Sequence, residues 1–368
     1  MPSSDPISVA LTVEQSWHRV PGGTAVAALG LARALLERDD VSVIGVAAAH
    51  RSRAPEDWQP PVPVRHLPLP RPLLYESWHR LRWPAVESAT GPVSVIHATT
   101  MAMPPRRAPV VMTVHDLAFL HEPSHFTSRG LRFFRRGLQL ALEEADVIVC
   151  PSRATARDAA AAGFDPGRTH VVPLGVDASP VSAEHVSTVR AKHGLDRPYV
   201  LWTGTIEPRK NLPRLIEAFR ALDGEVLLAL AGPEGWNEDL EALTPGLQGR
   251  VHALGFVPHS ELGALYAGAE VFCFPSLLEG FGFPVLEAMA QGTPVVTSAG
   301  TSTEEVVGDA GVLVNPLDAG SIEAGLRSVL EDPGLAARLG DAGRARAATY
   351  TWTSTASALV DVYREVAG

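Results

Sequence analysis

The sequence has few cysteines and no long hydrophobic run. Its only cysteines are Cys150 and Cys273, which end short apolar runs and lie in no C-x-x-C pair or histidine cluster, so we expect two buried thiols rather than a metal site. No apolar stretch approaches the roughly 18 residues of a membrane span. The start MPSSDPISVALTVEQ also lacks the features of a signal peptide, and we therefore expect a cytoplasmic protein.

Basic residues are not in excess either. The chain has 31 Lys and Arg against 41 Asp and Glu, a formal net charge of -10, which argues against general nucleic-acid binding. The hydrophobic share of 46% is that of an ordinary globular protein. Because 368 residues exceed one usual core, we expect two domains.

Short valine-rich runs alternate with alanine-rich helical patterns along the chain, which is typical of βαβ units and parallel sheets. The first half has predicted strands at 7–13, 41–47, 62–69, 93–99, 110–116, 146–152 and 169–176. The second half has them at 198–204, 225–233, 250–257, 270–276, 294–300 and 311–316. We predict an α/β protein of two doubly wound, Rossmann-like domains. The similar strings ADVIVCPS (145–152) and AEVFCFPS (269–276) favour one such strand per domain.

The domain boundaries follow from composition. The first domain is predicted over residues 1–177 and the second over 198–350. Residues 178–197 are polar and without a strand pattern, which favours a linker. Residues 351–368 are predicted to form a final helix after the second sheet.

The stretch SLLEGFGFPVLEAMAQ (276–291) carries the most specific signal. Pro284 is predicted to open a helix that stops at Gly292, so the turn before it offers backbone N–H groups to an anion. Glu287 would lie in the first turn of that helix, where its carboxylate is suited to accept hydrogen bonds from a neutral diol. Glu279 would follow the strand 270–276, at the carboxyl end where open α/β sheets bind ligands. Alternatively, Glu287 caps its own helix and Glu279 is only solvated.

The string E-GFGFPVL-E followed by AMAQGTPVV resembles the retaining glycosyltransferases of family four, whose GT-B fold has two Rossmann-like domains facing a central cleft. The resemblance implies that Glu279 contacts the hydroxyls of the donor sugar and that Glu287 contacts the ribose. It implies that the backbone of Gly280, Phe281, Gly282 and Phe283 contacts the sugar and the diphosphate. It also implies that the final helix crosses back to the N-terminal domain.

The turn GTIEPRKNL (204–212) follows a predicted strand and precedes a helical pattern for which Asn211 is the expected N-cap. Two adjacent cations there can neutralise a leaving diphosphate. Lys210 matches the family's lysine, but Thr205 stands where an arginine is common, so Arg209 is expected to supply that charge. The sequence has no D-x-D triplet, so we expect neither a metal nor another cofactor. A solvated basic turn is the alternative.

The first domain offers two further candidates. Gly22 and Gly23 begin a helical pattern, which permits close approach of a phosphate to the backbone, although an ordinary turn has the same composition. By resemblance, this loop lies over the donor phosphate, with Trp17, His18 and Arg19 on the acceptor side. His115, after the strand 110–116, matches a family histidine close to the donor sugar, and Asp116 is expected to orient it.

The nucleobase is expected, by analogy with the fold, near AGPEG (231–235) and the end of the strand 250–257 at Val257. The basic helix at 129–142 has two interpretations: it lies on an anionic lipid surface as a peripheral membrane contact, or it packs on its own sheet. We favour packing. Nothing in the sequence indicates an oligomeric state.

Together, these residues predict a retaining, metal-independent transferase that moves a hexose from a nucleotide diphosphate sugar to a hydroxyl of a glycan, lipid-linked or small-molecule acceptor. The HDLAFL and GTIEPRKNL variants resemble the mannosyltransferase branch of the family, and this resemblance implies mannose from GDP-mannose. The alternatives are a nucleotide-sugar epimerase or hydrolase on a similar scaffold, and a non-catalytic nucleotide-sugar binder. A dinucleotide dehydrogenase is disfavoured because no GxGxxG follows the first strand of either domain.

Overall fold

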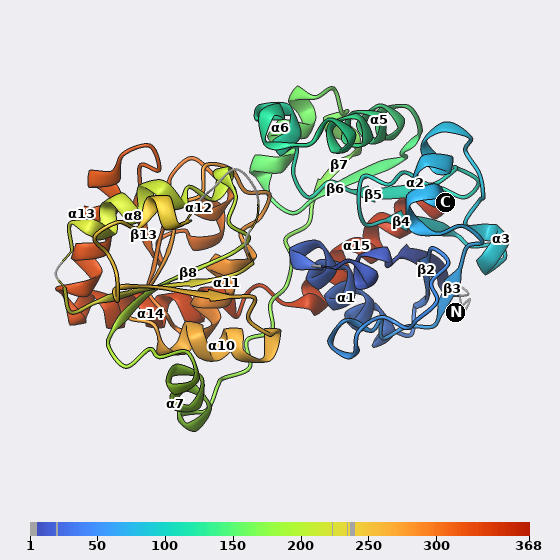
Figure 1. Cartoon of the computed structure of the whole chain (residues 1–368). Coiled ribbons are helices and arrows are strands. Elements are labelled where there is room, and N and C mark those ends of the chain that lie inside the picture. The colour runs from blue at the N-terminus through green and yellow to red at the C-terminus, as the bar shows by residue number, and fades with distance from the viewer. Residues whose placement is uncertain (1–5, 20, 223, 234, 236–239) are drawn as a thin grey trace. The chain divides into compact units, whose positions relative to one another are not determined.

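The computed structural model describes residues 6–368 except 20, 223, 234 and 236–239. The chain forms two compact units (Figure 1). Unit 1 comprises the residues up to Gly175 together with Tyr350–Gly368, and unit 2 comprises Val176–Thr349. Each unit has its own parallel sheet, which confirms the predicted fold class of two Rossmann-like α/β domains.

The sheet of unit 1 has seven strands in the order β3-β2-β1-β4-β5-β6-β7, and that of unit 2 has six in the order β10-β9-β8-β11-β12-β13. The strands are β1 (Ile7–Thr12), β2 (Val41–Ala47), β3 (Val64–His66), β4 (Val95–Ala98), β5 (Val110–Thr113), β6 (Val147–Cys150), β7 (Thr169–Val171), β8 (Tyr199–Thr203), β9 (Leu227–Ala231), β10 (Val251–Gly255), β11 (Val271–Phe274), β12 (Val295–Ser298) and β13 (Val312–Val314). Each lies within a predicted range. The central strands are buried on both faces, which explains their unbroken apolar runs.

The helices follow the expected alternation with strands. The α-helices are α1 (Gly22–Leu36), α2 (Arg71–Arg80), α3 (Glu87–Thr90), α4 (Ala118–His121), α5 (Ser128–Glu144), α6 (Arg153–Ala161), α7 (Ala183–Lys192), α8 (Leu212–Arg220), α9 (Leu240–Leu243), α10 (His259–Gly268), α11 (Phe283–Gln291), α12 (Ser302–Val307), α13 (Ala319–Leu330), α14 (Pro333–Ala347) and α15 (Trp352–Ala367). Short 3-10 helices include Glu14–Trp17, Glu56–Trp58 and Pro208–Lys210.

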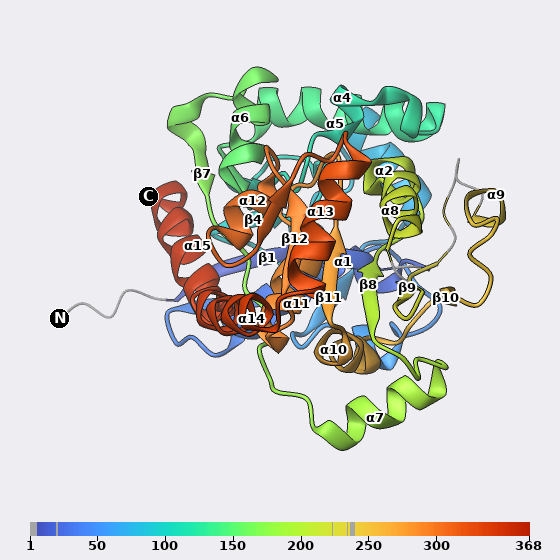
Figure 2. The same ribbon diagram turned by 90° about the vertical axis from the view of Figure 1, so that its left-hand side faces the viewer.

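Half of the segment predicted as a linker, residues 178–197, forms a helix. This helix, α7, lies against α10 within unit 2 (Figure 2). Its N-terminus is capped by the Ser182 hydroxyl, which accepts a hydrogen bond from the His185 N–H at 3.2 Å. Val189 is its only buried residue among those described, so the helix has almost no apolar stripe for a periodicity search to detect.

The last helix, α15, belongs to unit 1, where it packs against α1. Tyr363 is fully buried there, and its hydroxyl lies 2.6 Å from His97 Nδ1 in β4. The chain enters α15 by a close backbone approach, because a Cβ on Gly175 would lie 2.2 Å from the Trp352 nitrogen. A larger residue at Gly175 would therefore displace the start of the helix.

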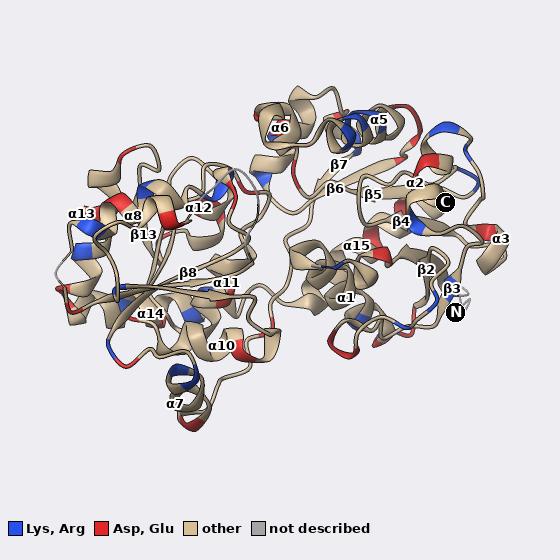
Figure 3. Ribbon diagram, in the orientation of Figure 1, with Lys and Arg blue, Asp and Glu red and all other residues tan. Residues whose placement is uncertain are grey.

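Helix α5 places one face on the core of unit 1 and a row of arginines outside (Figure 3). Leu138 and Leu140 are buried, whereas Arg129, Arg132 and Arg135 are exposed. This is the packing that the sequence favours, and lipid contact by the basic face remains an untested prediction. Among the described helices, none is both long and apolar enough to cross a membrane.

Candidate active site

The turn between β8 and α8 positions the two predicted cations. Lys210 ends the 3-10 helix Pro208–Lys210 and is only 7% exposed. Asn211 follows in the left-handed conformation at φ 59°. Asn211 occupies the predicted N-cap position of α8, but its side chain makes no capping hydrogen bond: its amide nitrogen donates instead to the Pro275 and Pro316 carbonyls, at 2.9 and 2.7 Å. Asn211 therefore ties this turn to the end of β11.

Three predicted residues meet at the carboxyl ends of β8 and β11. Lys210 Nζ lies 2.6 Å from Glu279 Oε1, and Arg209 Nη1 lies 3.1 Å from the same oxygen. Arg209 Nε also contacts Glu207 Oε1 at 2.6 Å, a partner that the sequence analysis did not anticipate. Lys210 Nζ sits 4.7 Å from the centre of the Phe274 ring. The arrangement is a mostly buried cluster of two cations and two carboxylates.

The charges in this cluster depend on one another. Burial alone would raise the pKa of Glu279, but the positive charges of Lys210 and Arg209 outweigh it and hold that pKa below its usual value. Burial and the Arg209 charge lower the pKa of Lys210. The Glu279 carboxylate acts in the opposite direction and does not cancel them. Glu279 is therefore ionised at neutral pH, which allows it to accept hydrogen bonds from hydroxyl groups.

The glycine-rich turn requires its glycines. Gly282 has φ 105°, and a Cβ there would lie 2.8 Å from Thr303 Cγ2. It precedes α11, in which Pro284 falls in the first two positions and Gly292 ends the helix in the left-handed conformation. Ser302 Oγ donates to the Glu279 carbonyl at 2.7 Å and fixes the start of the turn. Gly280 and Phe281 lie between Glu279 and Gly282, and Phe283 is the first residue of α11.

Glu287 has a different set of neighbours from Glu279. It was expected in the first turn of the helix but is the fifth residue, because α11 begins at Phe283. The Tyr266 hydroxyl of α10 donates to its Oε2 at 2.9 Å, and the same hydroxyl lies 2.9 Å from Thr203 Oγ1 at the end of β8. Burial raises the pKa of Glu287. Tyr266 was missed because it is an ordinary core position in its helical pattern.

The ends of β8, β9 and β10 come together beside this group, where the nucleobase was expected. A Cβ on Gly232 would lie only 1.8 Å from the Gly204 carbonyl oxygen, and one on Gly235 would lie 2.1 Å from that of Ile206. Val257, two residues after β10, is buried. Glu234 of the AGPEG stretch lies outside the described residues.

Unit 1 places His115 two residues after β5, at the carboxyl edge of its sheet. Its Nε2 lies 3.0 Å from the Thr99 carbonyl, which can only accept, so Nε2 carries the proton and Nδ1 is the acceptor of the ring. Burial lowers the pKa of His115, against the effects of Thr99 and Asp116, and the ring is neutral at pH 7. The Asp116 carboxylate accepts a hydrogen bond from the Ala118 N–H at 3.1 Å, and His115 is oriented by the hydrogen bond that it donates to the Thr99 carbonyl.

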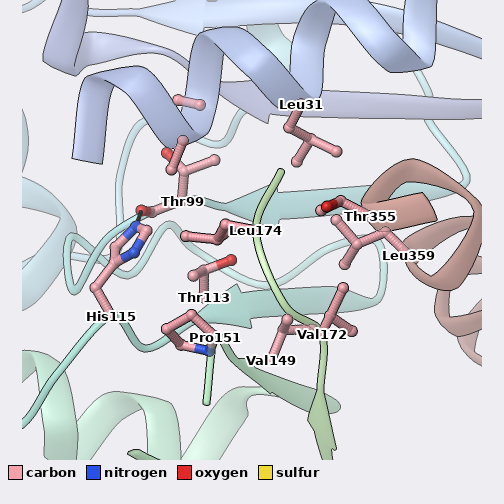
Figure 4. A pocket seen from close by; sticks show the side chains of 12 residues that line it. Leu31, Thr99, Thr113, His115, Val149, Pro151, Val172, Leu174, Thr355 and Leu359 are labelled. Carbon is pink, nitrogen blue, oxygen red and sulfur yellow. Dashed lines mark hydrogen bonds between the residues drawn. The ribbon is translucent and has the colours of Figure 1, made fainter. Parts of the chain in front are cut away.

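His115 lies beside a small, mostly apolar cavity (Figure 4). The cavity is lined by residues that include Leu31, Thr99, Thr113, Val149, Leu174 and Leu359. Gly22 and Gly23 are both exposed at the start of α1, and Gly22 has φ 63°. Trp17 and His18 are partly buried and Arg19 is exposed. Among the residues that the structure describes, no group of His, Cys, Asp and Glu is arranged to hold a metal ion.

Both halves of the chain match known families. Residues 21–180 match the family described as "Glycosyltransferase Family 4", and residues 186–346 match "Glycosyl transferases group 1". The chain is 32% identical to O-antigen chain mannosyltransferase B of Escherichia coli over 73% of this chain and 74% of that protein. It is 31% identical to D-inositol 3-phosphate glycosyltransferase of Xylanimonas cellulosilytica over 94% of this chain and 92% of that protein. It is 38% identical to MMP alpha-(1->4)-mannosyltransferase of Mycolicibacterium hassiacum over 54% of this chain and 49% of that protein.

The fold also matches a solved structure, HepE of Anabaena in complex with UDP-glucose. The TM-score is 0.77 at 22% identity, over 98% of this chain and all of that one. At this identity the match shows the fold, which is of the GT-B type. The length and identity of the match to the Escherichia coli mannosyltransferase show the family. The chain belongs to glycosyltransferase family 4.

Proposed function

We propose that this glycosyltransferase moves mannose from GDP-mannose to a hydroxyl acceptor, with retention of configuration and without a metal ion. The observation that carries the proposal is the cluster of Lys210, Arg209 and Glu279 at the carboxyl ends of β8 and β11. The choice of mannose is supported by the mannosyltransferases among the relatives, two of which are described above. The acceptor is a glycan, a lipid-linked sugar or a small molecule.

The cations supply the electrostatic part of the proposed reaction. The bond between the sugar C1 and the diphosphate oxygen breaks, so negative charge grows on the leaving phosphate. Lys210 and Arg209 stabilise that charge, which is the task of a metal ion in enzymes that use one. The absence of a D-x-D triplet from the sequence agrees with this assignment.

The carboxylates and His115 hold the donor. Glu279 is ionised and accepts hydrogen bonds from the sugar hydroxyls, while Glu287, next to Tyr266, accepts them from the ribose. The backbone of the Gly280–Phe283 turn binds sugar and diphosphate oxygens ahead of α11. His115, with Nδ1 as its acceptor, receives a hydrogen bond from a sugar hydroxyl.

Retention follows from attack on the same face as the departing phosphate. The acceptor oxygen forms the new bond to C1, and its proton passes to the leaving phosphate oxygen. This scheme requires no covalent intermediate, which agrees with the absence of a candidate nucleophile among the assigned residues.

A donor panel tests the proposal. The protein is incubated with GDP-mannose, UDP-glucose and other nucleotide sugars, with and without acceptors, and NMR gives the anomeric configuration of the product. We expect transfer from GDP-mannose with an α-linked product. A β-linked product would overturn retention, and conversion of the donor alone would favour an epimerase or hydrolase. Tight donor binding without turnover on a broad acceptor panel would favour a non-catalytic binder.

A further inference from the structure

Tyr266 of α10 is buried in unit 2 in a fixed position. It is 2% exposed, and its ring packs edge-on against Phe272 of β11 with ring centres 5.3 Å apart. The Thr293 hydroxyl donates a hydrogen bond to the Tyr266 backbone carbonyl at 2.6 Å. Because both the ring and the backbone of Tyr266 are held, the position of its hydroxyl is fixed as well.

The two contacts of the Tyr266 hydroxyl have a direction. This hydroxyl donates its single proton to Glu287 Oε2 at 2.9 Å. Thr203 Oγ1, at the end of β8, lies 2.9 Å from the same hydroxyl and must therefore be the donor of that second bond. A chain of two hydrogen bonds thus runs from β8 through α10 to the carboxylate on α11, and the first bond strengthens the second.

Glu287 keeps one carboxylate oxygen for a ligand. The residue is partly exposed, and of the residues that the structure describes none hydrogen-bonds to its Oε1, which is not buried. Burial raises the pKa of Glu287, and the hydrogen bond from Tyr266 acts in the opposite direction because it favours the ionised carboxylate. One oxygen is therefore fixed by Tyr266 while the other remains accessible.

A tyrosine that serves only the core needs no carboxylate. Tyr199 of β8 shows this in the same unit, because it is fully buried and its hydroxyl donates to the Leu265 backbone carbonyl at 2.6 Å. A carbonyl is neutral, so this bond takes no charge out of water. Tyr266 instead binds a partly desolvated carboxylate, which costs free energy unless a ligand completes the arrangement.

The strand end that supplies Thr203 also lies beside the proposed diphosphate site. Gly204 follows Thr203 in the chain, and a Cβ on Gly204 would lie 3.6 Å from Lys210 Cε. The hydrogen-bond chain therefore ties Glu287 to the strand end against which Lys210 packs. Ribose and diphosphate are adjacent in a nucleotide, so a site that binds both has to hold their two partners at a fixed spacing.

We propose that Tyr266, supported by Thr203, is a positioning residue that orients the Glu287 carboxylate toward the ribose of the donor. The inference deepens the proposed function and rests on it, because the proposed function assigns Glu287 to the ribose. With Oε2 held by Tyr266, Oε1 accepts hydrogen bonds from the ribose diol. Tyr266 acts through Glu287 and does not itself contact the donor.

Calorimetric titration with nucleotides that differ only in the diol tests this role. GDP and UDP are each compared with their 2′,3′-dideoxy forms, and the base that the wild-type protein binds is used throughout. We expect the wild-type protein to prefer the natural diphosphate by about tenfold or more, the factor for one charge-assisted hydrogen bond. Tyr266→Phe removes only the hydroxyl and should reduce this preference to about threefold or less, with the affinity for the dideoxy form nearly unchanged.

A second variant and a matched control accompany Tyr266→Phe. Thr203→Val removes the donor to Tyr266 and keeps the side-chain shape, so the preference should fall in the same direction by a smaller factor. Tyr199→Phe loses an equally buried hydroxyl of the same unit and should keep the wild-type preference. Melting temperatures establish which variants are folded. If Tyr266→Phe does not fold, Thr203→Val decides, and a wild-type preference in it overturns the proposal.

The pH dependence of the preference separates positioning from packing. Protonation of Glu287 should abolish the preference for the diol at low pH. Loss of the Tyr266 hydroxyl raises the pKa of Glu287, so Tyr266→Phe should lose its remaining preference at a higher pH than the wild-type protein. His259, at the start of α10, also lowers the pKa of Glu287, but it is present in both proteins and its titration cancels in the comparison.

The outcomes distinguish this role from the proposed function. If Glu287→Gln abolishes the preference and Tyr266→Phe does not, the positioning role fails and the ribose assignment of Glu287 stands. If Tyr266→Phe weakens the natural and dideoxy forms by the same factor at every pH, Tyr266 only packs, and the positioning role fails again. If the wild-type protein shows no preference for the diol, both this role and the ribose assignment fail. Binding of UDP in place of GDP would overturn GDP-mannose as the donor and leave the test of Tyr266 intact.

Discussion

Lys210 and Glu279 lie 69 residues apart in the chain, yet Lys210 Nζ is 2.6 Å from Glu279 Oε1. The strand order of unit 2 explains the meeting, because β8 and β11 are neighbours in its sheet and both residues follow the carboxyl ends of those strands. Two charges taken out of water need such compensation. The pair therefore places a cation and an anion together at the edge where ligands bind in this fold.

Lys210→Ala is expected to lower turnover by about 10²-fold or more, because Lys210 is assigned to charge that grows toward the transition state. The fold should persist, since Arg209 Nη1 remains 3.1 Å from Glu279. Steady-state kinetics and the melting temperature are measured together. Lys192→Ala, at an exposed lysine of the same unit, is the control and should retain full turnover. A folded Lys210→Ala protein with near wild-type turnover contradicts the role.

The two glutamates should differ in what they bind. Glu287→Gln is expected to weaken GDP and GDP-mannose by similar factors, because both ligands contain the ribose. Glu279→Gln should leave the affinity for GDP nearly unchanged but lower the affinity for the donor, turnover, or both. Each variant would lose the negative charge that strengthens its hydrogen bonds, and such charge-assisted bonds contribute about 1.5–3 kcal/mol. Calorimetry with both ligands decides, and equal losses of GDP affinity in the two variants would refute the division.

Metal independence is a separate prediction. Transfer should continue at an unchanged rate in excess EDTA, because Lys210 and Arg209 are assigned the neutralising charge. The measurement is initial rate with EDTA, and again after addition of magnesium or manganese. Complete loss of transfer that either ion restores would show that the two cations are not sufficient.

Much of this architecture was predictable because it depends on local patterns. Valine-rich runs located the strands, and the Gly282, Pro284 and Gly292 signals located α11. These features follow from backbone preferences of single residues and from burial of central parallel strands on both faces. The family resemblance assigned Glu279 and Lys210 to the same donor, but the sequence did not predict the contact between them.

Other features depend on tertiary contacts that no local pattern encodes. Residues 178–197, which contain α7, were predicted as a linker because they are polar and lack a strand pattern. Asn211 was correctly predicted at the N-cap position, but its side chain does not cap the helix. The left-handed backbone of Asn211 turns its side chain toward Pro275 instead. Tyr266 carries no motif, and only the fold brings its hydroxyl to Glu287.

The last prediction concerns the acid stability of unit 1. His97 is fully buried between the Tyr363 hydroxyl at 2.6 Å and Thr113 Oγ1 at 2.7 Å. Burial lowers its pKa to about 3, and burial likewise lowers the pKa of His79 to about 4. In the unfolded chain a histidine has a pKa of about 6.5.

Below pH 6.5, the unfolded chain therefore binds a proton at His97 that the folded unit does not, and the free energy of unfolding falls as the pH is lowered toward 3. The loss from His97 alone is about 1.4 kcal/mol for each pH unit in that window. Hydrogen exchange of the β4 amides between pH 7 and 4, corrected for intrinsic rates, measures it. His97→Gln should be less stable at pH 7, because it loses the fit to Tyr363, but its stability should fall less steeply with acid. His121→Gln, at an exposed histidine, is the control and should keep the wild-type slope. An unchanged slope in His97→Gln would mean that other groups govern the acid sensitivity of this unit.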